Sequence, residues 1–144
     1  LAPPGEYTVA VCPLRVDSTD IFLHHKTSHR EIYDRCQQAC PDLDDVILVN
    51  ERGELTETRI GNLVLEIDGR RLTPPRDSGL LAGTFRDELL SRGEIEEQVL
   101  MIDDLPRASS VFTVNSVREW VPVTVVCDSA DPERVIQTSL SARL

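Results

Sequence analysis

The sequence lacks several features that mark common classes of protein. No apolar run approaches the roughly 20 residues that a membrane-spanning helix needs. Basic residues occur singly or in pairs instead of forming a stripe, and the formal net charge of the 144 residues is -10. Such a charge repels phosphate backbones and anionic lipid head groups. We therefore expect a soluble protein that binds neither nucleic acid nor a membrane.

Paired metal-binding motifs are absent too, since neither a CxxC pair nor an HExxH motif occurs. The sequence has four cysteines, at positions 12, 36, 40 and 127, and three histidines, at 24, 25 and 29. Cys36 and Cys40 are one helical turn apart, but a zinc site would need two more ligands at matching spacing. We expect no metal. Without a recognisable signal peptide, we expect a cytoplasmic location and reduced, half-buried thiols.

The residue patterns predict one α/β (α+β) domain over residues 1–144. Alternating or β-branched apolar runs predict strands at 7–12, 46–49, 54–59, 62–67, 70–73, 98–102, 111–114 and 121–126. Helical spacing and capping residues predict helices at 29–40 and 84–91, a helical turn at 105–109 and a last helix from 131. Asp68 and Gly69 accept the positive φ angles of a type I′ turn, which predicts a hairpin.

Two residues in extended segments are candidates for chemistry, although each has an ordinary structural interpretation. Lys26 stands at the end of an extended stretch before a helix, where a solvated surface charge is the commoner interpretation. A buried lysine would instead lose its charge readily and act as an amine nucleophile. Glu57 lies in a predicted strand, where most glutamates are exposed. A carboxylate buried against a pyridine nitrogen would keep that ring protonated.

Two loops add further candidates. Residues 79–84 open a predicted helix, so backbone N–H groups and the Thr84 hydroxyl would suit a phosphate, although simple helix capping gives the same pattern. An acidic protein needs such a local positive potential to bind an anionic cofactor. Residues 115–118 follow a predicted strand, where ligand-contacting loops are common. Arg118 would clamp a carboxylate there or, on the simpler interpretation, lie on the surface.

Taken together and in this order, four segments resemble the class-IV aminotransferases. The segments are FLHHKTSHR (22–30), VNERGELTETRIGNL (49–63), LTPPRDSGLLAGTFRDELL (72–90) and VFTVNSVREWVPV (111–123). The likeness extends from about residue 14 to residue 126 and is strongest to the aminodeoxychorismate lyases of that family. It implies the large C-terminal domain of a fold-type IV pyridoxal-phosphate enzyme, a mixed or antiparallel sheet forming a pseudo-barrel with flanking helices.

The resemblance also implies roles for individual residues. Lys26 would hold pyridoxal 5'-phosphate covalently and act in catalysis, and Glu57 would pair with the pyridinium nitrogen. The remaining cofactor contacts that it implies are Asn62, Arg59, Ala82, Gly83, Thr84 and Ser116. Arg118 and Asn115 would meet a substrate carboxylate.

The resemblance leaves the reaction open among three alternatives. The first is a lyase that converts 4-amino-4-deoxychorismate to 4-aminobenzoate and pyruvate, in folate synthesis. The second is an aminotransferase of the branched-chain or D-amino acid type. The third is a truncated, non-catalytic domain that acts through dimerisation, because nothing in the chain corresponds to the smaller N-terminal domain of complete members. We expect a small-molecule substrate and a homodimer, or association with a fuller subunit.

Overall fold

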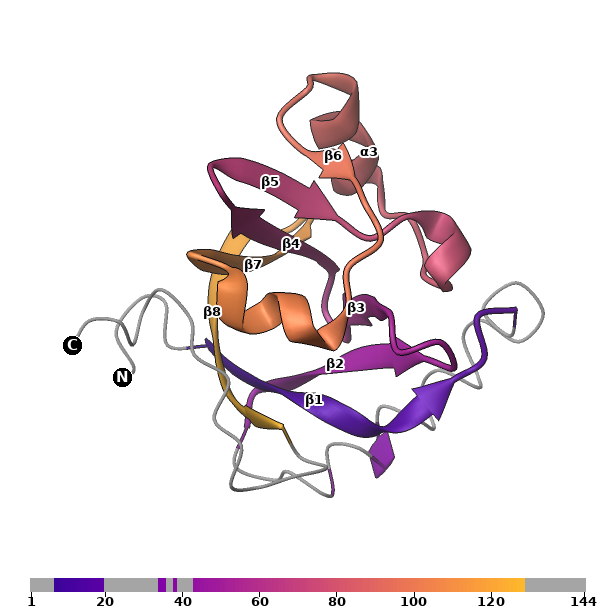
Figure 1. Cartoon of the computed structure of the whole chain (residues 1–144). Coiled ribbons are helices and arrows are strands. Elements are labelled where there is room, and N and C mark those ends of the chain that lie inside the picture. Colours follow the sequence, from indigo (N-terminus) through magenta and orange to yellow (C-terminus); the bar gives the residue numbers. More distant parts are fainter. Residues whose placement is uncertain (1–6, 20–33, 36–37, 39–42, 129–144) are drawn as a thin grey trace.

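The computed structural model describes residues 7–19, 34–35, 38 and 43–128 (Figure 1). Lys26 lies outside these residues, as do most of the helix predicted for 29–40 and the whole of the last predicted helix. Asp34, Arg35 and Gln38 are the described residues of the first of these helices, and all three are helical.

Eight strands form one mixed sheet. They are β1 (Tyr7–Val16), β2 (Asp45–Asn50), β3 (Leu55–Thr58), β4 (Asn62–Ile67), β5 (Arg70–Thr73), β6 (Glu96–Glu97), β7 (Ser110–Asn115) and β8 (Glu119–Asp128). Their order is β3-β2-β1-β8-β7-β4-β5-β6, and an added pairing of β3 with β4 closes six of them into a ring. β1 runs parallel to both β2 and β8, whereas the other neighbours in the ring are antiparallel. The predicted closed, mixed sheet is confirmed.

The alternation of apolar side chains along the strands explains why the sheet closes around a core. In β4, Leu63, Leu65 and Ile67 belong to the main buried cluster, which also draws on β1, β2, β7 and β8. Val64 between them packs in a separate cluster under the helix α3 (Thr84–Ser91). Since successive side chains of a strand point to opposite faces, β4 contributes to an inner and an outer core at once.

Helix α3 covers the outer cluster and has the predicted bounds. Phe85 and Leu89, one turn apart, are the buried apolar residues on its inner side and pack with Val64 and Val114 of the sheet. Gly93, with φ 75°, follows its C-terminus, where a glycine with a positive φ angle commonly ends a helix. The packing of α3 on β4 and β7 fixes where its N-terminus lies.

The hairpin of β4 and β5 is confirmed, with φ 54° at Asp68 and φ 79° at Gly69. The strand predicted at 98–102 is wrong. Glu96–Glu97 alone form β6, and the following residues switch partners: the Gln98 N–H donates to Thr73 and the Leu55 N–H to Leu100. Leu100 is fully buried in the main core. Pairing in this run is limited to the Leu55–Leu100 hydrogen bond and an isolated bridge between Glu54 and Met101, so the alternating apolar residues do not form a regular strand.

Two smaller expectations also change. The helical turn predicted at 105–109 is a 3-10 helix, η2 (Ile102–Arg107), begun by the Met101 N–H donating to Asp104 at 2.8 Å. Cys12 of β1 is disulfide-bonded, against the expectation of reduced thiols. A second 3-10 helix, η1 (Arg76–Ser78), precedes the loop that leads to α3.

Across the described part of the chain, no helix combines the length and apolar character needed to span a membrane. The same residues contain no cluster of three or more acidic, histidine or cysteine side chains arranged to hold a metal ion.

Candidate functional site

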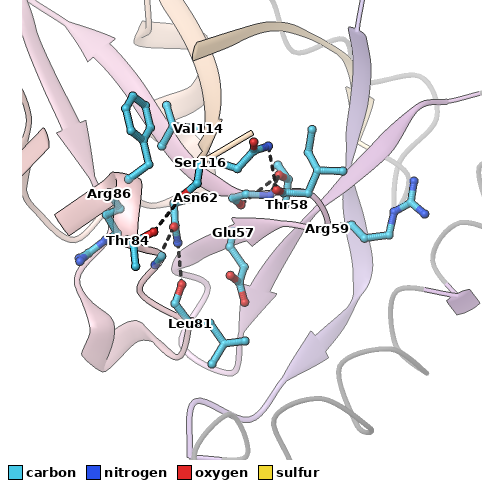
Figure 2. Close-up of a pocket in the computed structure, with 14 residues that line it drawn as sticks. Glu57, Thr58, Arg59, Asn62, Leu81, Thr84, Arg86, Val114 and Ser116 are labelled. Atoms are coloured by element: carbon cyan, nitrogen blue, oxygen red, sulfur yellow. Dashed lines mark hydrogen bonds between the residues drawn. The ribbon is translucent and has the colours of Figure 1, made fainter. Parts of the chain in front are cut away.

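A cavity of about 320 Å³ brings together three stretches that are distant in sequence (Figure 2). Its lining comes from residues 57–62, from 81 and 83–86, and from 114–116. Of the predicted site residues, the following line it: Glu57, Arg59, Asn62, Gly83, Thr84, Asn115 and Ser116. Arg118 does not, and Lys26 lies outside the described residues.

Strand register explains why the first and third stretches meet. Glu57 of β3 pairs with Asn62 of β4, and Asn62 pairs with Val114 of β7. The turn between β3 and β4 is closed by the Thr58 N–H, which donates to the Gly61 carbonyl at 3.0 Å. A Cβ atom at Gly61 would lie 2.2 Å from the Val114 carbonyl oxygen, so only glycine allows this close approach.

Glu57, a residue that is 7% exposed, provides one end of the cavity with a carboxyl group. Burial raises the pKa of Glu57 to about 8, because removal from water disfavours the charged form. The backbone N–H of Leu81 donates to the carboxyl and lowers the pKa in part. At neutral pH the group is therefore mostly protonated, and a cationic partner in the cavity would favour its carboxylate form.

The other end of the cavity is the N-terminus of α3. Gly83 is the N-cap residue, and no side chain in the described part of the chain caps the helix, so none of these side chains satisfies the N–H groups of the first turn. The hydroxyls of Thr84 and Ser116 lie 2.7 Å apart, joining the start of α3 to the end of β7. A helix N-terminus flanked by two hydroxyls is well suited to an anion such as a phosphate.

Asn62 lies between these two ends and is 4% exposed. Its amide nitrogen donates to the Leu81 carbonyl at 2.9 Å, and its amide oxygen accepts from the Gly83 N–H at 3.1 Å. Figure 2 shows both contacts as dashed lines from the same side chain.

The Arg59 side chain points away from Glu57, Asn62 and Thr84 (Figure 2). Its guanidinium donates to the Asp44 carbonyl at 3.2 Å and lies 3.8 Å from the Asp45 carboxylate. Arg59 thus lines the cavity without directing its charge into it. Its predicted contact with the cofactor stays a prediction.

Asn115 and Arg118 belong to the turn between β7 and β8. The Asn115 oxygen accepts from the N–H groups of Val117 and Arg118 at 2.9 and 2.7 Å, while its nitrogen donates to the Ile60 carbonyl at 3.0 Å. Asn115 therefore ties this turn to the β3–β4 turn. Arg118 is exposed, so its role toward a substrate, like that of Asn115, stays a prediction.

Sequence reasoning missed two buried residues that support the cavity walls. Asp45, 0% exposed, accepts from the N–H groups of Arg59 and Ile60 at 3.0 and 3.2 Å. Arg86, 1% exposed, donates to the Pro74 carbonyl at 3.1 Å and to Glu97 at 2.5 Å, which holds the first turn of α3. Both act through contacts with distant segments, and no local sequence signal identifies them.

Comparison with known proteins agrees with this geometry. The family model of class-IV aminotransferases matches residues 1–126. A Schizosaccharomyces pombe protein, provisionally named an aminodeoxychorismate lyase, is 34% identical over 102 residues, which are 66% of this chain and 44% of that protein. A Thermotoga maritima protein, provisionally named a branched-chain-amino-acid aminotransferase, is 31% identical over 87 residues, covering 57% of this chain and 32% of that protein.

A solved structure from Mesorhizobium loti, provisionally described as an amino-acid aminotransferase, has a TM-score of 0.77 and 38% identity. The match covers 88% of this chain and 62% of that one. The chain thus spans less than half of the length of the two curated relatives. Since the family model matches most of the sequence, the chain belongs to the class-IV aminotransferase family.

Proposed function

We propose that this chain is the cofactor-binding part of a pyridoxal-phosphate-dependent lyase that converts 4-amino-4-deoxychorismate to 4-aminobenzoate and pyruvate. The observation that carries the proposal is the cavity that has a buried carboxyl group at one end and an uncapped helix N-terminus with two hydroxyls at the other. The Schizosaccharomyces pombe relative supports the lyase over other reactions of the family.

The residues of the cavity fit pyridoxal phosphate. Glu57 would pair with the ring nitrogen, because an opposite charge favours its carboxylate form. Thr84, Ser116 and the first N–H groups of α3 would hold the phosphate, since this end of the cavity offers hydrogen-bond donors and a positive dipole. When bound, the cofactor supplies an electron sink for a carbanion at the substrate.

Lys26 would provide the amine that holds the cofactor. It is the only lysine in this sequence, so no other side chain of the chain can form the covalent link. Once the substrate amine displaces it, the ε-amine of Lys26 would take the proton from the substrate carbon that bears the nitrogen. The C–O bond to the enolpyruvyl group would then break, and the group would leave as enolpyruvate, which takes up a proton to become pyruvate. Formation of an aromatic ring favours this direction.

An amino acid transaminase is the second candidate, favoured by the Thermotoga maritima and Mesorhizobium loti proteins. It would use Lys26 and Glu57 in the same way, but no leaving group would depart and Lys26 would give its proton back. The residues on the substrate side of the cavity would therefore decide between the two reactions. We further propose a cytoplasmic protein that forms a homodimer or pairs with a fuller subunit.

Covalent labelling tests the role of Lys26. Borohydride treatment of the full-length protein with pyridoxal phosphate should fix one cofactor on the peptide that contains Lys26, as measured by mass spectrometry. Lys26→Ala should abolish the label, whereas Arg30→Ala, a neighbouring change, should leave it. Unchanged labelling in Lys26→Ala would overturn the assignment.

Product analysis separates the candidate functions. A lyase should release pyruvate from aminodeoxychorismate without an added 2-oxo acid. Activity that requires a 2-oxo acid would identify an aminotransferase. A protein that binds the cofactor and catalyses neither reaction, yet dimerises, would support the non-catalytic alternative.

A further inference from the structure

The loop at residues 81–83 takes part in both ends of the cavity. Its first peptide directs the Leu81 N–H to the Glu57 carboxyl. Its last residue, Gly83, is the N-cap of α3 and so begins the turn that would bind the phosphate. The position of this short loop therefore sets two features of the site at once.

Asn62 makes the contacts that hold this loop. Its amide group uses both polar atoms on the loop, donating to the Leu81 carbonyl at 2.9 Å and accepting from the Gly83 N–H at 3.1 Å. The Leu81 carbonyl thus accepts a hydrogen bond from the Asn62 amide nitrogen, and the Leu81 N–H donates to the Glu57 carboxyl. Because Asn62 itself pairs with Glu57 and Val114 in the sheet, it ties the loop to strands β3 and β7.

Packing leaves little freedom in this contact. A Cβ atom at Gly83 would lie 2.9 Å from the Asn62 amide oxygen, closer than side chains tolerate. Gly83 has φ -74°, which any residue can adopt, so the close approach to Asn62 is the constraint on this position. The hydrogen bond between Asn62 and the loop therefore depends on a residue without a Cβ atom at position 83.

We propose that Asn62 is a positioning residue, which couples the ring-nitrogen end of the cofactor site to its phosphate end by fixing the loop at 81–83. The inference rests on the proposed function and gives Asn62 a role through the loop instead of direct contact with the cofactor. Loss of the side chain should therefore weaken phosphate binding and also alter the environment of Glu57.

Binding of pyridoxal phosphate and of pyridoxal, which lacks the phosphate, tests the first part. In the full-length protein, Asn62→Ala should lower affinity for pyridoxal phosphate about tenfold more than affinity for pyridoxal, measured by absorbance titration. Gly83→Ala should also lower the ratio of the affinity for pyridoxal phosphate to the affinity for pyridoxal. The reason is that the added Cβ atom would displace the Asn62 amide oxygen while the Asn62 side chain is still present. Equal losses for the two ligands in both variants would overturn the proposal.

Asn50 offers a matched control. It is also fully buried and also braces a loop, donating to the Ser78 carbonyl at 2.8 Å, but it does not line the cavity. Asn50→Ala should lower stability and leave the ratio of the two affinities unchanged. A change in that ratio as large as in Asn62→Ala would show a general loss of structure and refute a specific role for Asn62.

Titration of Glu57 in the cofactor-free protein tests the second part. Because the Leu81 N–H favours the carboxylate, its displacement in Asn62→Ala should raise the pKa of Glu57 further, as followed by carboxyl-carbon NMR. Glu57→Gln assigns the signal, and Asn50→Ala should not move it. An unmoved titration would refute the coupling. If the wild type binds neither pyridoxal phosphate nor pyridoxal, the proposed function fails, while this titration still decides whether Asn62 acts on Glu57.

Discussion

The two ends of the cavity differ in their polar groups, because one has a buried ionisable carboxyl group and the other has exposed neutral hydroxyls. At one end Glu57 is an ionisable group nearly out of contact with water, and the Leu81 N–H donates to it. At the other end Thr84 and Ser116 are exposed neutral side chains beside the start of α3. At the first end burial disfavours the ionised form of the carboxyl group, and at the second end backbone N–H groups and hydroxyls present their dipoles.

This difference shows how an acidic chain can accommodate an anionic cofactor. In the proposed site, backbone N–H groups and hydroxyls at the start of α3 would provide a local positive potential for the phosphate, whatever the net charge of the chain. The ionised form of Glu57 is unfavourable in the free protein and becomes favourable when a cation lies against it. Stability and binding should therefore respond differently to changes at the two ends.

The largest effect should come from Glu57 and should depend on pH. The pKa of this group rises from 4.5 to about 8 on folding, so the folded protein binds its proton more tightly than the unfolded chain does. The free energy of unfolding should fall as pH rises from about 4.5 to 8, by as much as about 5 kcal/mol from this group, and then stay level. Glu57→Gln should remove this fall, which makes the cofactor-free variant more stable than the wild type above pH 8.

Denaturant unfolding of the cofactor-free protein at pH 5, 7 and 9 measures this effect. Glu66→Gln is the control, because Glu66 of β4 does not line the cavity. Parallel stability profiles for Glu57→Gln and the wild type would mean that folding does not raise the pKa of Glu57. The proposed difference between the two ends of the cavity would then be wrong.

A smaller effect, on binding alone, should come from the phosphate end. Thr84→Val and Ser116→Ala should each weaken pyridoxal phosphate binding by about three- to tenfold, because each removes one hydroxyl donor. Since the two hydroxyls share a hydrogen bond, the double variant should lose less than the product of the single losses. Stability should change by less than about 0.5 kcal/mol, because both side chains are exposed.

Absorbance titration with pyridoxal phosphate and pyridoxal provides the measurement. The effect should be confined to the phosphorylated ligand. Equal weakening of pyridoxal binding would place these hydroxyls elsewhere relative to the cofactor and would remove the contrast with Glu57.

The smallest effect should come from Arg118, which is exposed and outside the cavity lining. Arg118→Gln should leave cofactor affinity within about twofold and raise the KM for a carboxylate substrate by less than about fivefold, as expected for an exposed ion pair. Steady-state kinetics beside a cofactor titration measures both. A large loss of cofactor affinity would contradict this prediction. It would mean that Arg118 contacts the cofactor and that the β7–β8 turn is part of the phosphate end of the site.

Local sequence signals predicted the elements that depend on neighbouring residues. The β4–β5 hairpin follows from Asp68 and Gly69, whose positive φ angles are a property of a two-residue turn. Helix α3 follows from its own spacing and from the glycines that flank it. The strand predicted at 98–102 was wrong because Leu100 is buried in the core without belonging to a regular strand, and apolar spacing alone does not distinguish the two cases.

The sequence by itself determined the family, the closed sheet and half of the residues that line the cavity, because its motifs have a recognisable order and content. Only the tertiary structure showed that Asn62 holds the loop at 81–83, that Asp45 holds the β3–β4 turn, and that the Arg59 guanidinium faces away from the cavity. The reason is physical: hydrogen-bond geometry and burial depend on which segments meet, and residues up to 21 positions apart along the chain make these contacts.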